Sequence, residues 1–444
     1  MTVADAPRQL RESLLRDTVA WCTANSRFYR ERLPSPETVG GLDDLARMPV
    51  LYRDEVIEHQ ERLICDPSPP AAVQHTTGTT GPFLEVLRSA SEQAFIWEFF
   101  AAQLAVADQR LPRPLHLNLA NAYHGALTPL PSNAYVLSAG VHDQAQAAQA
   151  RAILERSYDL AGVEPRVSVV MGTERMVKAL TAYLIADGYD LDGGAVRTVA
   201  LFGGHVSTAR KRLLAELWGA TVRDQYSLTE VFGGATECGI GGPWVFDPHV
   251  IPEVVHPRTL EPVGEGIGVL LMTGLYPFVQ QMPLIRYFTG DLVEVVSGPD
   301  APGGPEVRYA GRLSRSLVDD GGPTVEPLLL SGPLYEILEA LPDVAVSPRF
   351  PDLPAGPGLE LTGDLHYDVR GERDRDGALA TIRIRVGLRY APWMYADRVA
   401  ELVAHLTSRL HRAHPELARR CQAGAVELVV EPCLAADVAP YDSK

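Results

Sequence analysis

The order of apolar runs in the middle of this 444-residue chain constrains its fold most strongly. Val167–Met171 is a short apolar run that predicts a buried strand, and Thr173–Ala186 then carries apolar residues at helical spacing. The same order repeats, because Val196–Phe202 predicts a strand, Ser207 a helix N-cap and Gly219 a helix end. Alternating strands and helices predict a layered α/β sheet.

Further elements are predicted on both sides of this region. Residues 8–24 have apolar positions at helical spacing, and Ser91 is expected to cap a second helix. Towards the C-terminus, apolar and polar residues alternate over Ala380–Leu388, which predicts a half-exposed strand. A helix over Ala396–Ala413 and a last strand over Ala425–Val430 would complete a small α+β unit.

The length of the chain exceeds that of one ordinary hydrophobic core, so two or three domains are expected. A Pro/Gly-rich loop spans 297–306, and we place a boundary shortly after it. We therefore predict an α/β fold with a large multi-sheet N-terminal domain over 1–312 and a small, mobile α+β C-terminal domain over 313–444.

The charge and cysteine content exclude several classes of protein. The chain has 56 Asp and Glu against 40 Lys and Arg, a formal net charge of −16, which argues against nucleic-acid or membrane-surface binding. No apolar run is long enough to span a bilayer, and the polar start is no secretory signal. The five cysteines form no CxxC pair, so a cytoplasmic protein without disulfides is expected.

The segment His75–Pro82 places two glycines among four threonines. Such a loop can bring backbone N–H groups and hydroxyls close to an anion, because glycine has no side chain to hold the backbone away. It does not follow the usual GxxxxGK[ST] spacing. On its own it reads equally well as a phosphate-binding loop or as a Thr/Gly-rich hairpin or linker.

Three more motifs follow it in the chain. Asp224–Glu230 combines an aromatic ring, hydroxyls and a carboxylate that could stack a base, bond phosphate and hold Mg²⁺, and it comes after the turn Leu201–His205. Ile285–Asp291 ends in an aspartate that could accept both ribose hydroxyls, and Gly311-Arg312 stands at the predicted boundary. Taken singly, each could also be a strand end, a turn or a surface arginine.

Together and in this order, the motifs resemble those of the acyl/aryl-adenylate-forming superfamily, and most closely its phenylacetate–CoA ligase branch. The resemblance covers nearly the whole chain. It is carried by Asn25–Arg30 ("NSPFYR" in that branch), Leu45–Val50 ("LPF"), Leu201–Gly204 ("GAEP"), Tyr226–Glu230 ("YGLSE"), Arg286–Asp291 ("RYRTGD") and Gly311-Arg312 ("GR").

The resemblance implies a nucleotide site. Gly203, Gly204 and Tyr226 would frame adenine, with Ser227 beside them, and Asp291 would bind the ribose hydroxyls. The ATP phosphates would lie on the loop residues Thr76, Thr77, Gly78, Thr79, Thr80 and Gly81.

The resemblance also implies catalytic roles. Glu230 would bind Mg²⁺, Thr229 would lie near the α-phosphate and Arg312 would reach the ribose side. A late catalytic lysine of the family has Lys444 as its sole candidate here, which reads equally well as a disordered terminal residue.

The acid pocket is expected between the phosphate loop and the adenine loop. Asn121–Ala126 matches an aromatic/glycine segment of the family, so Tyr123, His124 and Gly125 would line the pocket, with His205 on its other side. His124 could instead be a packed loop histidine.

The chain departs from the family pattern at several places. Pro82 directly follows Gly81, so the usual loop lysine is absent and Arg88 is the nearest cation. In the hinge, Ser314 and Arg315 replace two acids. Some relatives hold a structural zinc, but Cys238 and His249, even with Glu253 nearby, do not make a closed site, and we expect no zinc.

These observations predict an ATP-dependent ligase that uses ATP and Mg²⁺ to adenylate a carboxylic acid, expected to be aromatic. The acyl group would then pass to a thiol, amine or hydroxyl, with CoA as the default acceptor. Two alternatives stay open: a nucleotidyltransferase that makes a stable AMP ester, and a degenerate, non-catalytic nucleotide-binding homologue. The sequence also leaves a homodimer open.

Overall fold

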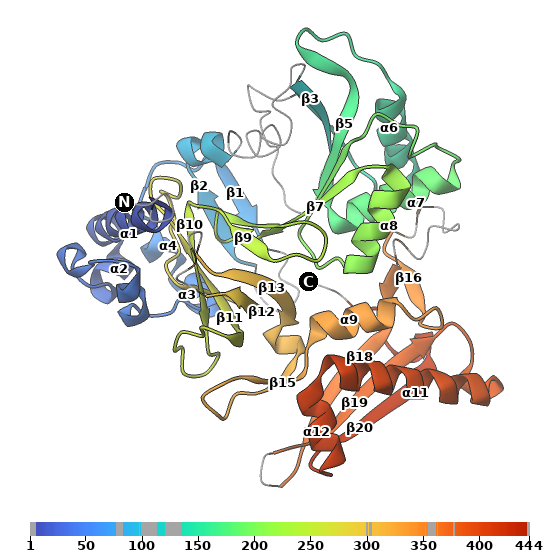
Figure 1. Cartoon of the computed structure of the whole chain (residues 1–444). Helices are drawn as coiled ribbons and strands as arrows, with labels where there is room; N and C mark the ends of the chain where they lie inside the picture. The colour runs from blue at the N-terminus through green and yellow to red at the C-terminus, as the bar shows by residue number, and fades with distance from the viewer. Residues whose placement is uncertain are drawn as a thin grey trace.

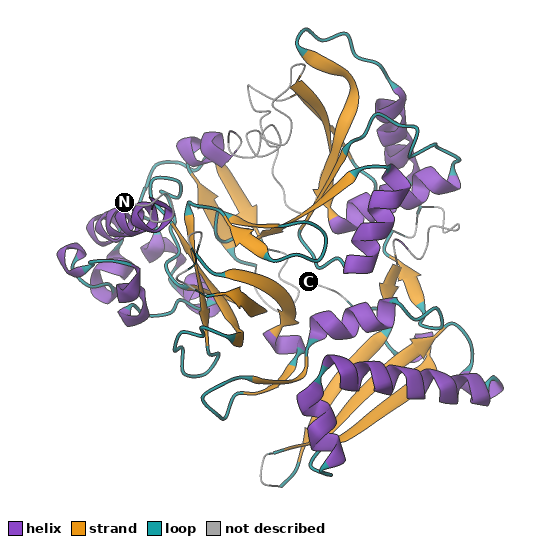
Figure 2. Ribbon diagram, in the orientation of Figure 1, coloured by secondary structure: helices purple, strands orange, loops and turns teal. Residues whose placement is uncertain are grey.

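The computed structural model describes residues 6–76, 83–96, 98, 113–119, 135–298, 301, 304–350, 352–353, 361, 363–375 and 378–441. Its main feature is a mixed sheet whose strands lie in the order β10-β11-β12-β13-β9-β8-β7-β6-β5-β3-β4. Smaller sheets lie beside it, so the predicted α/β fold with a large multi-sheet region is confirmed (Figures 1 and 2).

One half of the sheet is parallel and is backed by helices (Figure 2). Leu117, Val170 and Val199 on neighbouring strands point to the same face and pack with Leu180 of α7 and Leu214 of α8 in one apolar core. The strands are β3 (Arg113–Leu119), β4 (Tyr135–Ala139), β5 (Val163–Thr173), β6 (Thr198–Phe202) and β7 (Thr221–Ser227), and the helices are α6 (Gln144–Glu155), α7 (Glu174–Ala186) and α8 (Thr208–Trp218).

The other half of the sheet is antiparallel and packs against the N-terminal helices. A β1–β2 hairpin flanks it and carries the ends of the predicted phosphate loop. The strands are β1 (Ala72–His75), β2 (Glu85–Arg88), β8 (Gly234–Glu237), β9 (Trp244–Phe246), β10 (Val250–Val255), β11 (Gly266–Gly274), β12 (Tyr287–Ser297) and β13 (Glu306–Arg312), and the helices are α1 (Ala6–Asn25), α2 (Arg27–Arg32), α3 (Arg53–Glu58) and α4 (Gln60–Leu63), with 3₁₀ turns at Pro36–Thr38 and Leu42–Arg47.

The C-terminal part, where α9 and α11 lie beside a small sheet (Figure 1), has a separate apolar core. In it, Leu338 of α9 and Leu406 of α11 pack with Ile384. Its main sheet is three-stranded, with β19 antiparallel to β18 and parallel to β20. The elements are β14 (Leu317–Asp319), β15 (Glu326–Leu329), α9 (Ser331–Glu339), β16 (Val346–Pro348), β17 (Gly363–Leu365), β18 (Tyr367–Arg373), β19 (Leu379–Leu388), α11 (Ala396–Ala413), α12 (Pro415–Gln422) and β20 (Glu427–Leu434), with 3₁₀ turns at Leu313–Arg315, Pro392–Met394 and Ala435–Asp437.

The helix ends test the sequence predictions. Ser207 accepts from the Arg210 N–H at 3.0 Å and caps α8, and Gly219 ends that helix in the left-handed region at φ 55°, as predicted. Ser91 as an N-cap was wrong, because residue 90 is already helical and Ser89 caps the helix. The Glu92 N–H donates to Ser89 Oγ at 3.2 Å while the Ser89 N–H donates to the Glu92 carboxylate, a capping box that holds both residues.

None of the helices in the described part of the chain combines the length and the apolar character that crossing a bilayer requires.

Candidate active site

Two of the predicted motifs lie at the same edge of the parallel half-sheet. Phe202 at the end of β6 pairs with Gln225 near the end of β7, so Gly203-Gly204 and Leu228–Glu230 both follow the carboxyl ends of neighbouring strands. In open α/β sheets, ligands bind at this edge. The turn needs its glycines, because Gly203 has φ 81° and a Cβ on Gly204 would lie 2.7 Å from Glu174 Oε1.

Asp291 joins the third and fourth motifs to this edge. It pairs with Arg312 across β12 and β13, and Arg312 Nη1 donates to Asp291 Oδ1 at 2.9 Å. The Tyr226 hydroxyl donates to Asp291 Oδ2 at 2.7 Å. Arg312 Nη1 also donates to the Thr289 carbonyl at 2.9 Å, which fixes its direction. The fold thus brings Tyr226, Asp291 and Arg312 together, three residues that the sequence assigned to one nucleotide.

Opposing electrostatic effects act on the Asp291 carboxyl group. Its pKa is raised, because burial of this residue, which is 4% exposed, outweighs the lowering by the Arg312 guanidinium and the Tyr226 hydroxyl. The Asp291 charge in turn raises the pKa of Arg312 above its ordinary value. Each Asp291 oxygen keeps further lone-pair capacity, so the carboxylate can also accept from ligand hydroxyls.

Aromatic rings back the trio on one side. Tyr226 stacks on Trp244, with ring centroids 5.1 Å apart and an interplanar angle of 29°. Trp244 stacks in turn on Tyr309, and Tyr309 lies against His205 with a centroid distance of 5.0 Å. Trp244 therefore takes one face of Tyr226, so that a ligand ring would use the other. Trp244 and Tyr309 carried no signal in the sequence, because they lie on β9 and β13, outside any motif.

His205 lies between the sheet and the C-terminal part. Its ring meets Tyr335 of α9 edge-on at a centroid distance of 6.0 Å, and its Nε2 lies 3.7 Å from Glu336 Oε1. Burial, with the nearby Lys211 and Lys178 charges, lowers the pKa of His205 to about 3, so the ring is neutral at pH 7. Its contact with a substrate stays a prediction.

Glu230 is held by two residues from distant segments. The Tyr287 hydroxyl donates to Glu230 Oε1 at 3.0 Å, and Arg53 Nη1 lies 3.8 Å from the same oxygen. Burial and the Glu230 charge raise the pKa of Tyr287, which keeps its hydroxyl protonated as a donor. Tyr287 lies within a quoted motif but had no assigned role, and Arg53 of α3 carried no signal in the sequence.

Of the remaining predicted site residues, the structure describes Thr76 and Ser227. Thr76 donates its N–H to the Leu84 carbonyl and its Oγ accepts from the Leu84 N–H, both at 3.0 Å, so it closes the base of the loop. These two bonds leave its hydroxyl hydrogen for a ligand. Ser227 is exposed. The other predicted residues of the phosphate loop and the acid pocket, and the predicted late lysine, lie outside the described residues: Thr77, Gly78, Thr79, Thr80, Gly81, Tyr123, His124, Gly125 and Lys444.

The three residues weighed for zinc have different surroundings. Cys238 is exposed, the His249 ring stacks on Phe232 with centroids 4.8 Å apart, and Glu253 binds Arg286 Nε through both oxygens at 3.1 Å. Within the described ranges, no three His, Cys, Asp or Glu side chains are grouped closely enough to hold a metal on their own.

Comparisons with known proteins identify relatives of the chain. A phenylacetate–coenzyme A ligase of Thermus thermophilus is 25% identical, over 93% of this chain and 89% of that protein. A phenylacetate–coenzyme A ligase of Escherichia coli is 34% identical over 30% of this chain and 31% of that protein. No family model matches the chain.

A solved structure shows the same fold. The 2-hydroxyisobutyryl-CoA ligase, in the postadenylation state in complex with R3-HIB-AMP, superposes with a TM-score of 0.67 at 17% identity. The superposition covers 100% of this chain and 89% of that chain.

Proposed function

We propose that this chain, a relative of the phenylacetate–coenzyme A ligases within the adenylate-forming superfamily, activates a carboxylic acid with ATP and then transfers the acyl group to CoA. The observation that carries the proposal is the Asp291 carboxylate, fixed by Tyr226 and Arg312 at the strand-end edge. The phenylacetate–coenzyme A ligase of Thermus thermophilus, which matches 93% of this chain, supports it.

The residues present fit ATP. The face of Tyr226 opposite Trp244 and the backbone of Gly203-Gly204 would hold adenine, since the glycines let a flat ring approach the turn. Asp291 would accept from the ribose hydroxyls, because its two oxygens are already oriented by Tyr226 and Arg312. We infer that the phosphates then extend towards Thr229 and Glu230.

The residues also fit Mg²⁺. A hard cation takes oxygen ligands, and magnesium commonly uses one or two carboxylates together with substrate phosphates and water. Among the described residues, Tyr287 and Arg53 both contact Glu230 through Oε1, and the Glu230 carboxylate would hold the ion. When bound, Mg²⁺ would neutralise charge on the phosphates.

The proposed chemistry has two steps. A carboxylate oxygen of the acid attacks the α-phosphorus of ATP, the bond from that phosphorus to the bridging oxygen breaks, and pyrophosphate leaves. The CoA thiolate sulfur then attacks the acyl carbonyl and AMP leaves. Both steps depend on alignment and charge compensation, which Asp291, Arg312 and Glu230 would supply by fixing the nucleotide.

The finer substrate class is also a proposal. We propose an aromatic acid, supported by relatives named for phenylacetate. The pocket residues Tyr123, His124 and Gly125, with His205, were inferred from the family resemblance. Because the structural neighbour is named for 2-hydroxyisobutyrate, a panel of test substrates should also include branched aliphatic acids.

We further propose that the chain divides at 312/313 into an adenylating domain and a mobile C-terminal domain. The separate core around Ile384 supports this division. Arg315, which follows the boundary, lies over the Tyr441 ring at 4.7 Å, so the hinge segment contacts the C-terminal end. Lys444 remains our candidate for the late lysine.

The test is a product assay with purified protein, ATP, Mg²⁺, CoA and single acids. The proposal expects AMP, pyrophosphate and an acyl-CoA thioester in equal amounts with at least one acid. A stable AMP ester without thioester would instead support the nucleotidyltransferase. ATP binding without any product would favour a non-catalytic homologue.

A further inference from the structure

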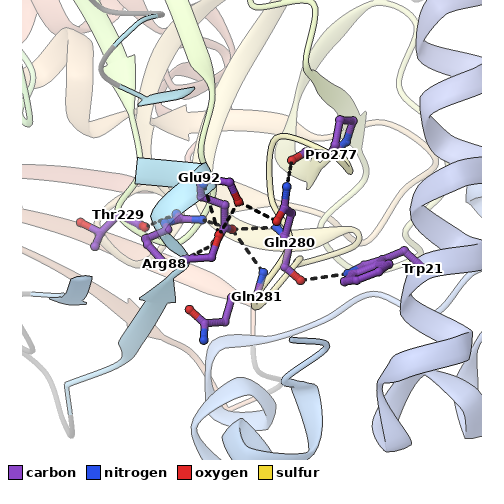
Figure 3. Close-up of polar contacts among 9 residues, drawn as sticks. Trp21, Arg88, Glu92, Thr229, Pro277, Gln280 and Gln281 are labelled. Atoms are coloured by element: carbon purple, nitrogen blue, oxygen red, sulfur yellow. Dashed lines mark hydrogen bonds and ion pairs between the residues drawn. The ribbon is translucent and has the colours of Figure 1, made fainter. Parts of the chain in front are cut away.

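A buried arginine follows the predicted phosphate loop. Arg88 is the last residue of β2 and is 1% exposed. Its Nη2 donates at 3.1 Å to the backbone carbonyl of Thr229, which is the residue before Glu230 (Figure 3). One side chain thus ties the strand after the phosphate loop to the backbone that carries the proposed magnesium ligand.

Glu92 holds this arginine from the helix that follows β2. Its Oε1 lies 3.9 Å from Arg88 Nη1, and Glu92 is 1% exposed. The same Oε1 accepts from the backbone N–H groups of Gln280 and Gln281 at 2.7 and 3.3 Å. Because Glu92 also takes the Ser89 N–H in the capping box, both of its oxygens are fixed by backbone donors.

The contacts continue into the N-terminal helices. The Gln280 carbonyl accepts from Trp21 Nε1 of α1 at 2.9 Å, and Gln280 Nε2 donates to the Pro277 carbonyl at 2.9 Å (Figure 3). Arg88 and Glu92 therefore connect the Thr229 backbone to the loop at Gln280, and that loop is held on α1 by Trp21.

A purely structural explanation fits this arginine poorly. Burial lowers the pKa of Arg88, and the Glu92 and Glu230 charges raise it, so its charge is maintained by two carboxylates. Within the described residues, Arg88 Nε and Nη1 have no hydrogen-bond partner. Burying an incompletely bonded charge is costly, so stability alone does not call for an arginine at this site. With Glu92 buried beside it, removal of Arg88 would nevertheless destabilise the fold, because that carboxylate would lose its counter-charge.

We propose that Arg88 is a positioning residue for Glu230: it fixes the Thr229 carbonyl, and with it the Glu230 carboxylate, relative to β2. The proposal rests on the proposed function, because it takes Glu230 as the magnesium ligand. Arg88 would act through Thr229 and Glu230 and need not touch the nucleotide itself. Loss of Arg88 should raise the Mg²⁺ concentration that ATP binding requires, beyond any effect that loss of stability alone would have.

The test measures ATP binding by calorimetry at a series of Mg²⁺ concentrations, in the absence of any carboxylic acid substrate. The variants are Arg88→Met and Arg88→Lys, and the control is Arg11→Met. Arg11 is a matched buried arginine, 3% exposed, whose Nη2 donates to the Asp247 carbonyl at 3.0 Å. Both Met variants should lower the unfolding temperature. A change in the Mg²⁺ dependence of ATP binding in Arg88→Met but not in Arg11→Met would therefore separate positioning from stability.

We expect Arg88→Met to raise the Mg²⁺ concentration for half-maximal ATP binding by about tenfold, as for loss of a charge-assisted hydrogen bond. Arg88→Lys should give an intermediate value, and Arg11→Met should stay within about twofold of the wild type. Equal Mg²⁺ dependence in the wild type and Arg88→Met would overturn the proposal. If Arg88→Met does not fold, the same comparison with Arg88→Lys decides, and a wild-type value there overturns it.

The same experiment separates this proposal from the proposed function. A wild-type chain that binds no ATP at any Mg²⁺ concentration would remove both proposals. A wild-type chain that binds Mg-ATP, with variants that show no change, would remove only the role of Arg88.

Discussion

The hydroxyl of Tyr226 donates a 2.7 Å hydrogen bond to Asp291 Oδ2, although 65 positions separate the two residues. The contact joins the end of the parallel half of the sheet to the antiparallel half, since Tyr226 lies on β7 and Asp291 on β12. The proposed nucleotide site lies across this junction, and its geometry depends on both halves.

The first prediction separates stacking from hydrogen bonding in the adenosine site. Tyr226→Phe keeps the ring on Trp244 but removes the donor to Asp291, so we expect the KM for ATP to rise by about three- to tenfold, as for one hydrogen bond. Asp291→Asn should raise it further, because Arg312 then loses its ion-pair partner. Steady-state kinetics at saturating acid measures both. An unchanged KM in Asp291→Asn would contradict the ribose role.

The second prediction concerns the metal ligand. Glu230→Gln should lower the rate of adenylation by at least about a hundredfold, since a neutral amide is a poor magnesium ligand. Tyr287→Phe keeps the carboxylate but removes the donor to Oε1, so its effect should be smaller and partly reversed by added Mg²⁺. Rates measured across a Mg²⁺ series would show this difference. Near-normal activity of Glu230→Gln would show that Glu230 is not the magnesium ligand.

The third prediction concerns stability against pH. Burial lowers the pKa of His116 to about 4, partly offset by Glu164, and within the described residues neither ring nitrogen has a hydrogen-bond partner. The unfolded chain takes up this proton near pH 6.5, but the folded chain does so only near 4, so stability is lost as pH falls between these values.

For that reason, His116→Leu should be less acid-sensitive than the wild type. Between pH 7.5 and pH 5, its free energy of unfolding should gain about 2 kcal/mol relative to the wild type. Denaturant unfolding at several pH values measures the difference, with the exposed His405→Leu of α11 as the control for loss of one histidine. Parallel pH curves for the wild type and His116→Leu would refute the assigned pKa direction.

The fourth prediction concerns the contact between α9 and α8. Glu336 Oε1 accepts from the Thr208 N–H at 3.2 Å, and Glu339 accepts from Ser207 Oγ and from Arg210 Nε. These carboxylates lie at the N-terminus of α8, where negative charge is favourable. The double variant Glu336→Gln/Glu339→Gln should increase amide hydrogen exchange in the first turn of α8 by about tenfold. Unchanged exchange would mean that the contact contributes little.

The sequence predicted the elements whose signals are local. The α11 bounds, Ala396–Ala413, agree with the prediction, because a strong apolar stripe and the flanking residues define that helix. Ser207 and Gly219 were also placed correctly, since caps depend on neighbouring residues. The Ser91 prediction failed because Ser89 and Glu92 form a better capping box three residues apart.

The site was predicted only as far as its motifs extend. Tyr226, Asp291 and Arg312 were assigned to one nucleotide and do meet. Trp244 and Arg53 were missed, because their roles come from strand order and from packing of the N-terminal helices. Long-range contacts of this kind leave no periodic or local trace in a single sequence.

The most direct test of the account is ATP–pyrophosphate exchange across a panel of benzoates, phenylacetates, cinnamates and aliphatic acids. We expect exchange that requires Mg²⁺ and one class of carboxylic acid, and that is lost in Glu230→Gln. Absence of exchange with every acid, in a protein that binds ATP, would contradict reversible adenylation as the central activity.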